Sequence, residues 1–436
     1  MNGQSSLATR TDRRLRWRIW LAVALVAAGV AVAWYLTWPG MLLDSAERAL
    51  LHDDPVSARG FLDRYRYYHP ANREALLLSA HVARRTDDFS GAERFLGEFE
   101  QIGRPNAASR LEWAMLGAQQ GDMSGEPELL QLVANKSSES PAILETLARG
   151  YNIGYRWLEA IDTLNFILDR NSSQASALVL RATIFEHLRR HDAALQDLRK
   201  AVETSPRNAA AQAALANRLL LDGFTREAIL HFELARQLKP ADPKILLGLA
   251  RALTDDADLV EADQRLDELL AAYPDNPDGL VEKGRLAVRQ EHFPEAEPYL
   301  ARAVKVAPWH QDGQSLNLVV LKELGRHQDA VECEHRLAEL RGQNALGGRL
   351  KLRAHDNQRD TNVRWDLWQW SQRNGQFEEG LAWLTEVLRI DPQNAQAHEA
   401  FADYFEKAGQ PRRAAQHRAD TKGATANAPA LNGDLK

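Results

Sequence analysis

The chain has 436 residues, of which 44% are hydrophobic and 26% charged, close to an ordinary globular protein. A single cysteine excludes a disulfide framework, a cysteine-based zinc site and an iron–sulfur cluster. The formal net charge of −6 argues against a general nucleic-acid-binding protein, whose surface should be basic.

The chain begins with a basic segment, residues 1–18, which carries five arginines and one aspartate. Residues 19–38 contain no charged side chain, and a helix of that length is about 30 Å long, the thickness of a bilayer's hydrocarbon core. Tryptophan and tyrosine side chains lie at both ends of this stretch, as at the two membrane interfaces. We therefore predict a cytoplasmic N-terminus and a transmembrane signal-anchor helix over 19–38. The protein would be a single-pass protein of the inner (plasma) membrane, with the rest of the chain extracytoplasmic, or periplasmic in a Gram-negative cell.

Two other interpretations of this segment remain. Ala31-Val32-Ala33 has the small-x-small pattern of a signal-peptidase site, which would make the segment a cleaved signal peptide. A buried helix of a soluble domain is the second. We favour the uncleaved anchor because the apolar stretch continues through residues 34–38 and reaches spanning length only when uncut.

The rest of the chain shows a period of 34 residues. Prolines recur with this spacing at Pro206, Pro240, Pro274 and Pro308. An alanine recurs in a second phase of the same period, at Ala58, Ala92, Ala160, Ala194, Ala228, Ala262, Ala296 and Ala330. Glu126 breaks this series, and Gly380 and Ala414 resume it after an offset. A fixed period of this length is typical of stacked helical hairpins.

Glycines occupy a third phase, between the two helices expected in each unit: Gly121, Gly223, Gly325, Gly375 and Gly409. Glycine adopts a positive φ at little cost, so we expect a tight helix–helix turn at this phase. Small residues at the phased alanine should let the two helices of a unit approach closely.

This pattern resembles the tetratricopeptide repeat family. The unit over 209–242 matches it best, with Leu215, Ala216, Leu219, Ala228, Phe232, Ala235 and Pro240 at the family's apolar, small and proline positions. The resemblance implies an all-α fold, in which a right-handed α-solenoid of about eleven helical hairpins follows the N-terminal transmembrane helix.

After Trp38 the chain divides into four parts. Units one to nine cover 39–344, an insertion covers 345–360, and units ten and eleven cover 361–420. Residues 421–436 are small and polar without an apolar period, so we expect a disordered tail, or alternatively an irregular cap on the last unit.

The sequence contains no recognisable catalytic pattern. It has no glycine-rich phosphate loop, and His398-Glu399 is not followed by a histidine at the spacing of a zinc protease. His187 and His191 are four residues apart but lack an evident third ligand. We therefore expect a non-enzymatic protein with no catalytic residue, cofactor, metal site, small-molecule substrate or nucleic-acid partner.

The resemblance further implies that the first helix of each unit lines a concave groove. At its ninth position five consecutive units carry Arg149, Thr183, Asn217, Arg251 and Arg285. Asn152 and Arg289 lie at neighbouring groove positions. Arginine offers a planar fork for carboxylates and backbone groups, so these residues are candidates for binding a protein partner. The alternative is that they are solvated and paired within the chain.

A second candidate surface is aromatic. Four tryptophans gather in unit ten beside the insertion: Trp365, Trp368, Trp370 and Trp383. They form either an exposed patch that receives a partner or a cluster covered by the insertion.

We predict a membrane-tethered scaffold that binds partner proteins and supports assembly of an envelope or export complex, such as one for polysaccharide. The alternatives are a non-catalytic regulatory subunit of a membrane enzyme complex, such as a polysaccharide synthase, and a cleaved soluble periplasmic chaperone. The link to envelope proteins is one of architecture alone.

Overall fold

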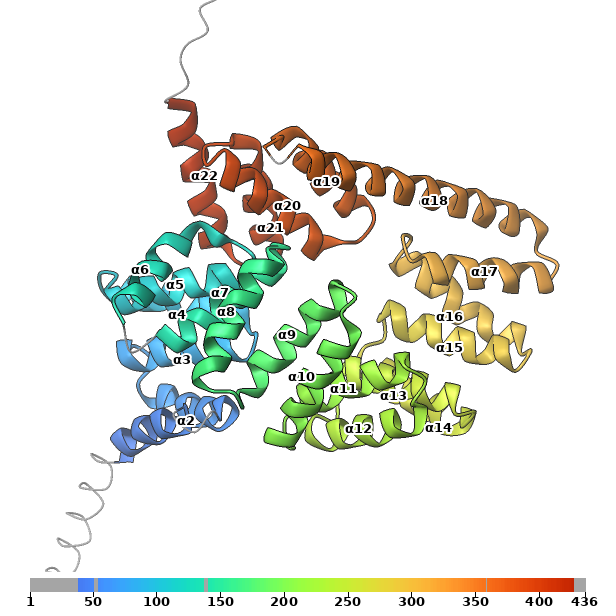
Figure 1. Cartoon of the computed structure of the whole chain (residues 1–436), viewed down its shortest axis with the longest axis horizontal. Helices are drawn as coiled ribbons and strands as arrows, with labels where there is room; N and C mark the ends of the chain where they lie inside the picture. Colours follow the sequence, from blue (N-terminus) through green and yellow to red (C-terminus); the bar gives the residue numbers. More distant parts are fainter. Residues whose placement is uncertain (1–37, 51–53, 137–139, 358, 427–436) are drawn as a thin grey trace, which may run out of the picture. The chain divides into compact units, whose positions relative to one another are not determined.

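The fold is an array of helical hairpins, as shown by a computed structural model of the chain (Figure 1). The structure describes residues 38–50, 54–136, 140–357 and 359–426, and every regular element in these ranges is a helix. The predicted basic segment 1–18, all but the last residue of the predicted anchor 19–38, and residues 427–436 lie outside the described residues. Within the described ranges no helix is both long enough and apolar enough for a bilayer span.

The helices follow one another with short connections. Residues 38–50 are helical and precede α2. The remaining helices are α2 (Pro55–Tyr68), α3 (Arg73–Arg85), α4 (Phe89–Ile102), α5 (Ala107–Gln119), the 3₁₀ turn η1 (Met123–Gly125), α6 (Glu126–Ala134), α7 (Ser140–Ile153), α8 (Trp157–Arg170), α9 (Ala175–His187), α10 (His191–Thr204), α11 (Ala209–Leu221), α12 (Thr225–Leu238), α13 (Pro243–Asp255), α14 (Leu259–Ala272), α15 (Pro277–Arg289), α16 (Phe293–Val306), α17 (Gln311–Glu323), α18 (His327–Asp356), α19 (Thr361–Arg373), α20 (Phe377–Ile390), α21 (Ala395–Lys407) and α22 (Pro411–Ala426).

In three successive hairpins the first helix begins directly after a capping Asn or Asp. The side chains of Asn208, Asp242 and Asn276 accept hydrogen bonds from the backbone N–H three residues further on, at 2.8–3.3 Å. Each cap satisfies a donor that the helix itself leaves unpaired. The helices that follow begin at residues 209, 243 and 277, one period apart.

The phased alanines are the closest contact points inside the hairpins. All eight are buried, with at most 4% of their surface exposed. The larger apolar residue four positions later is buried with them, as for Phe232, which is fully covered and lies against Gly248 of the next hairpin. A Cβ atom on Gly248 would come within 2.4 Å of the Phe232 ring, so this position requires glycine.

The turn between the two helices has a positive φ at the same phase throughout the chain. The five glycines expected there have φ between 68° and 85°. The structure adds five residues of the same 34-residue series that carry a side chain and still have φ between 55° and 66°: Asp87, Tyr155, Arg189, Ala257 and Glu291. The repeated turn thus imposes a left-handed conformation even where glycine is absent, at a cost of roughly 1–2 kcal/mol per residue.

The described helices divide into two compact units. Unit 1 comprises residues up to Leu116 together with Phe405–Arg413, and unit 2 comprises Gly117–Tyr404 with the residues from Ala414 onward. In unit 1, Arg412 joins the two stretches through an ion pair with Glu100 at 2.7 Å and a backbone hydrogen bond to Glu93 at 2.8 Å. In unit 2, a continuous apolar core runs through the hairpins from α9 to α15.

The predicted insertion and tail are partly helical. Residues 345–356 continue α18, which spans 30 residues, so the insertion lengthens the second helix of its hairpin. Leu346, Leu350 and Ala354 lie one turn apart on this extension and pack against α19. Helix α22 continues to Ala426, so residues 421–426 of the predicted disordered tail are helical.

The left-handed backbone of the repeated turn predicts that glycine there makes the protein more stable than alanine does. Ala257→Gly should raise the free energy of unfolding by on the order of 0.5–1 kcal/mol, because it removes left-handed strain at an exposed position. Gly223→Ala should lower it by a similar amount, since no atom near Gly223 would clash with the added methyl group. Thermal and urea unfolding monitored by circular dichroism measures both.

The control is Ala301→Gly at an exposed position inside α16. There the same substitution should destabilise the protein by about 1 kcal/mol, since glycine is a poor helix former. Destabilisation by Ala257→Gly would contradict the interpretation of the turn.

Candidate partner-binding surface

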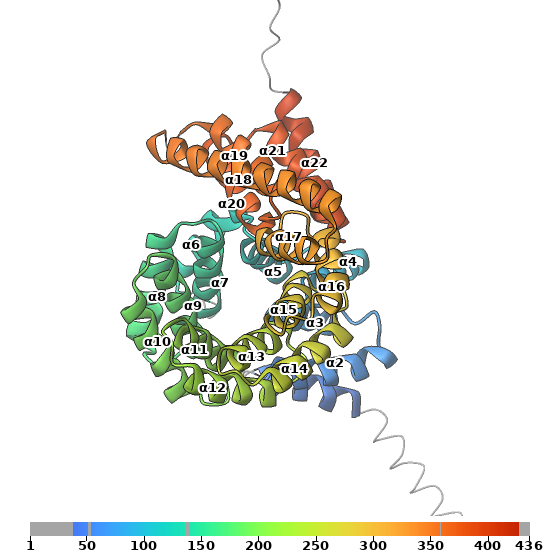
Figure 2. The same ribbon diagram turned by 90° about the vertical axis from the view of Figure 1, so that its right-hand side faces the viewer.

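The first helices of successive hairpins line one side of unit 2. Figure 2 shows α9, α11, α13 and α15 on the inner side of the curved array and α8, α10, α12 and α14 on its outer side. Consecutive first helices also contact one another, α9 with α11, α11 with α13 and α13 with α15. Side chains at equivalent positions of these helices therefore form rows on one surface, which we call the inner face.

Two of the predicted groove residues meet on this face. Arg251 of α13 and Arg285 of α15 both form ion pairs with Glu282, at 2.7 Å and 3.1 Å. Arg251 also lies 3.6 Å from Asp278, and Arg285 lies 3.5 Å from Asp312 of α17. Arg251 thus links α13 to two carboxylates of α15, and Arg285 links a carboxylate of its own helix to one of α17. The two arginine side chains remain 44% and 43% exposed, so both are paired and accessible.

The other groove candidates are spread along the array. Arg149 pairs with Glu145 one turn earlier in α7, at 3.3 Å. Asn217 is exposed and donates to the Ala213 carbonyl at 2.9 Å. Arg289 donates to the Thr254 carbonyl of the preceding first helix at 2.7 Å. Asn152 is half-buried near the end of α7. The structure therefore gathers Arg251, Arg285 and Arg289 on neighbouring helices and leaves Arg149 and Asn152 several helices away.

One carboxylate of the inner face, that of Asp278, is favoured in its ionised form. A hydrogen bond from His310 at 3.4 Å and the charge of Arg251 lower the pKa of Asp278 below its usual value. The same hydrogen bond raises the pKa of His310. Positively and negatively charged side chains thus alternate between α13, α15 and α17. The sequence pattern identified only the arginines, because the acidic residues occupy other positions of the repeat than the arginines do.

The four tryptophans of unit ten do not form one exposed patch. Trp370 is only 5% exposed, and its indole N–H donates to the Gln343 carbonyl of α18 at 2.6 Å. The extension of α18 can approach this ring because residue 347 is glycine. A Cβ atom added there would lie 2.2 Å from the Trp370 ring. The extension of α18, which was predicted as an insertion, therefore covers Trp370. This ring is unavailable to a partner, contrary to the hypothesis of an exposed aromatic patch.

The remaining three rings are half-buried. Trp365 and Trp368 pack against each other with 4.5 Å between ring centroids. Trp383 stacks on Tyr155 at 6.2 Å with nearly parallel planes, although 228 positions in the numbering separate them. This pair belongs to a contact between the late helix α20 and the early helices of unit 2, which also includes a hydrogen bond from Thr385 to the Gly121 carbonyl at 2.6 Å.

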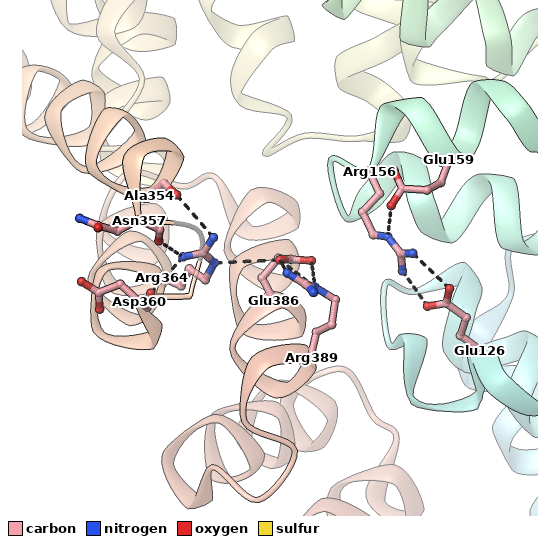
Figure 3. A network of polar contacts seen from close by, with 9 residues as sticks. All are labelled: Glu126, Arg156, Glu159, Ala354, Asn357, Asp360, Arg364, Glu386 and Arg389. Carbon is pink, nitrogen blue, oxygen red and sulfur yellow. Dashed lines mark hydrogen bonds and ion pairs between the residues drawn. The ribbon is translucent and has the colours of Figure 1, made fainter.

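A polar network accompanies that contact (Figure 3). On the side of α8, Arg156 pairs with Glu126 at 2.6 Å and with Glu159 at 2.9 Å. On the side of α20, Glu386 binds Arg389 at 2.8 Å. Glu126 is the residue that interrupts the alanine series, and its carboxylate also accepts a hydrogen bond from Tyr151 at 2.8 Å. In the sequence, the one sign of this network is that Glu126 interrupts the series of phased alanines.

The histidine pair considered from the sequence does not form a ligand pair. His187 ends α9 and stacks on Trp157 at 5.5 Å, whereas His191 begins α10 and lies 3.0 Å from Glu186. The cysteine at 333 is buried, and burial raises the pKa of its thiol.

Comparisons with known proteins place repeats in the centre of the chain. Two tetratricopeptide repeat models match it, one at residues 219–280 and the other at 156–209 and 281–345. Bacteriophage adsorption protein A of Escherichia coli (strain K12) is 29% identical over 203 residues, which are 47% of this chain. The match spans only 16% of that relative's length.

Two solved structures are similar to part of the chain. One is the pilF protein of Pseudomonas aeruginosa, with 19% identity, a TM-score of 0.43, and coverage of 46% of this chain and 92% of that one. The other is PilW, described as a widely conserved type IV pilus biogenesis factor, with 22% identity, a TM-score of 0.43, and coverage of 46% and 93%.

The ion pairs of the inner face predict a measurable coupling. A double-mutant cycle with Arg251→Ala and Glu282→Ala should give a coupling energy of about 0.5–1 kcal/mol, small because the guanidinium is partly exposed. The coupling should fall further in ~1 M salt, where charges are screened over a few ångströms. Unfolding by urea at both salt concentrations measures it, and an uncoupled pair would contradict the geometry described above.

Proposed function

Because residues 156–209 and 219–345 are tetratricopeptide repeats, we propose that this protein is a scaffold that binds a partner protein along the inner face of unit 2. The observation that carries the proposal is the pair of partly exposed arginines one repeat apart, Arg251 on α13 and Arg285 on α15, flanked by carboxylates of α15 and α17. Side chains at equivalent positions recur at the repeat spacing, which suits an extended segment better than a compact ligand.

The charges of this face suggest the partner's chemistry. Arg251 and Arg285 share one carboxylate, Glu282, which is 10% exposed at its side chain. Two guanidinium groups carry more donors than that carboxylate can accept, so both retain capacity for a further acceptor. We infer that a peptide segment with acidic side chains or an exposed backbone binds here, by accepting hydrogen bonds from these paired arginines.

We further propose that residues 19–38 anchor the protein in the inner membrane, with the repeats on the extracytoplasmic side. The support is the uncharged stretch itself and the charge distribution, since the arginines of residues 1–18 precede it. The similarity to a protein named for bacteriophage adsorption, a process at the cell surface, agrees with an envelope setting. In that setting the scaffold would support assembly of an envelope or export complex.

Photocrosslinking tests the binding face. A photoreactive residue at Asn217 on the inner face should capture a defined partner in intact membranes, whereas one at the exposed Leu230 of α12 should not. Arg251→Glu with Arg285→Glu should reduce capture from Asn217 at least about tenfold, because two charged contacts are reversed.

The matched control reverses two arginines on second helices, Arg226→Glu with Arg302→Glu. Both are exposed and also form ion pairs, with Asp256 and Asp275. Capture should survive in this variant, and circular dichroism should show equal helical content in both. Equal loss of capture in the two variants would contradict an inner-face site.

The anchor is tested separately, so that its failure leaves the binding face unaffected. N-terminal sequencing of the mature protein should find the chain starting before residue 19, since an uncut segment is required to span the bilayer. A start at Trp34 would mean a cleaved signal peptide. A reporter fused after residue 436 should be active outside the cytoplasm, and activity restricted to the cytoplasm would overturn the proposed topology.

A further inference from the structure

Three side chains that no part of the proposed function uses converge at the end of unit 2. They are His398 of α21 and His417 and Asp420 of α22. One potential ligand atom of each lies within 4.8 Å of the other two. The two histidines are 7% and 5% exposed, while Asp420 is at the surface.

The two histidine rings have oxygen atoms near their outer nitrogens. Nε2 of His398 lies 3.0 Å from the Pro392 carbonyl, and Nε2 of His417 lies 3.6 Å from the carboxylate of Asp122. The carbonyl can only accept, so Nε2 of His398 is its N–H donor, whereas 3.6 Å is too long for a hydrogen bond from His417 to Asp122. The two Nδ1 atoms are 2.9 Å apart and share one proton in a hydrogen bond, which a metal ion bound to both nitrogens would replace.

This arrangement matches the surroundings of metal-binding histidines. Such a histidine donates its far N–H to a carboxylate or a backbone carbonyl, which sets the tautomer and the ring orientation. Here the Pro392 carbonyl accepts from His398, and the Asp122 carboxylate lies 3.6 Å from the far nitrogen of His417. Phe401 also stacks on the His417 ring at 5.0 Å with a 13° angle between planes, which restricts rotation of the ring.

The spacing suits a transition-metal ion. Two nitrogens bound at ~2.05 Å are about 2.9 Å apart when they subtend a right angle at the ion, and about 3.3 Å apart at the tetrahedral angle. The observed 2.9 Å corresponds to neighbouring positions around an octahedral or square-planar ion, and a small opening would fit zinc. The third ligand, Asp420, follows His417 by one helical turn, so both side chains share a face of α22.

We propose that His398, His417 and Asp420 bind one divalent late first-row transition-metal ion, such as nickel or zinc, through both Nδ1 atoms and the Asp420 carboxylate. Water would complete the coordination on the exposed side of Asp420. The ion would join α21 to α22 and, through Asp122, hold this last hairpin against the early part of unit 2. Sequence spacing offers no hint of this site, because the two histidines are 19 positions apart on different helices.

Metal titration of the purified full-length chain, in detergent and without a histidine tag, tests the proposal. Isothermal titration with Ni²⁺ and Zn²⁺ should give one ion per chain and a rise in melting temperature, since the ion binds only the folded arrangement. Co²⁺ should produce a visible absorption band characteristic of nitrogen ligation. Absence of stoichiometric binding of all three ions would overturn the proposal.

Variants locate the site. His398→Gln and His417→Gln should each weaken binding by about 100-fold or more, and Asp420→Asn and Asp122→Asn by about 10-fold. Asp420 is exposed, so its variant should fold even if the buried histidine variants do not. The matched control is His335→Gln, which removes a surface histidine 3.4 Å from Glu339 and should leave affinity unchanged. Unchanged affinity in Asp420→Asn, or equal loss in His335→Gln, would contradict the assignment.

Discussion

The close approach of two helices at one small residue underlies the whole array. Where the phased alanine lies, the side chain is short enough for the helix axes to come together, and the larger apolar residue one turn later is then fully enclosed, as Phe232 is. A bulkier side chain at the alanine would separate the helices and expose that core. The positive-φ turn follows from the same contact, because a short connection must reverse the chain within a few residues. It persists at Tyr155 and Ala257, where no glycine relieves the strain.

Repetition of that contact creates the continuous inner face. Each hairpin presents equivalent positions on the same side, so the first helices form the inner face and a residue type at one position recurs along it. The ion pairs Arg251–Glu282 and Arg285–Asp312 then connect neighbouring repeats without closing the surface, because the arginines remain partly exposed. The same side chains therefore contribute modestly to stability and remain able to contact a partner.

The departures from the repeat carry contacts of their own. Glu126 replaces a phased alanine and instead binds Arg156 and Tyr151. The extension of α18 adds a helical stripe that covers Trp370, with Gly347 permitting the approach. His398 and His417 bring polar rings into a buried position between α21 and α22. In each case a residue that does not suit the regular hairpin is satisfied by a partner outside its own helix.

The amino-acid sequence by itself determined the all-helical fold, the period, the turn positions and the row of arginines, because these depend on contacts within one hairpin or between adjacent ones. First helices begin at residues 209, 243 and 277, the starts expected from the period alone. Only the tertiary structure decided which carboxylates pair with Arg251 and Arg285, that Trp370 is covered, and that His417 meets His398 and Asp122. Those contacts join residues at different positions of the repeat or in distant repeats. A local sequence pattern does not show which of these residues helix packing brings into contact.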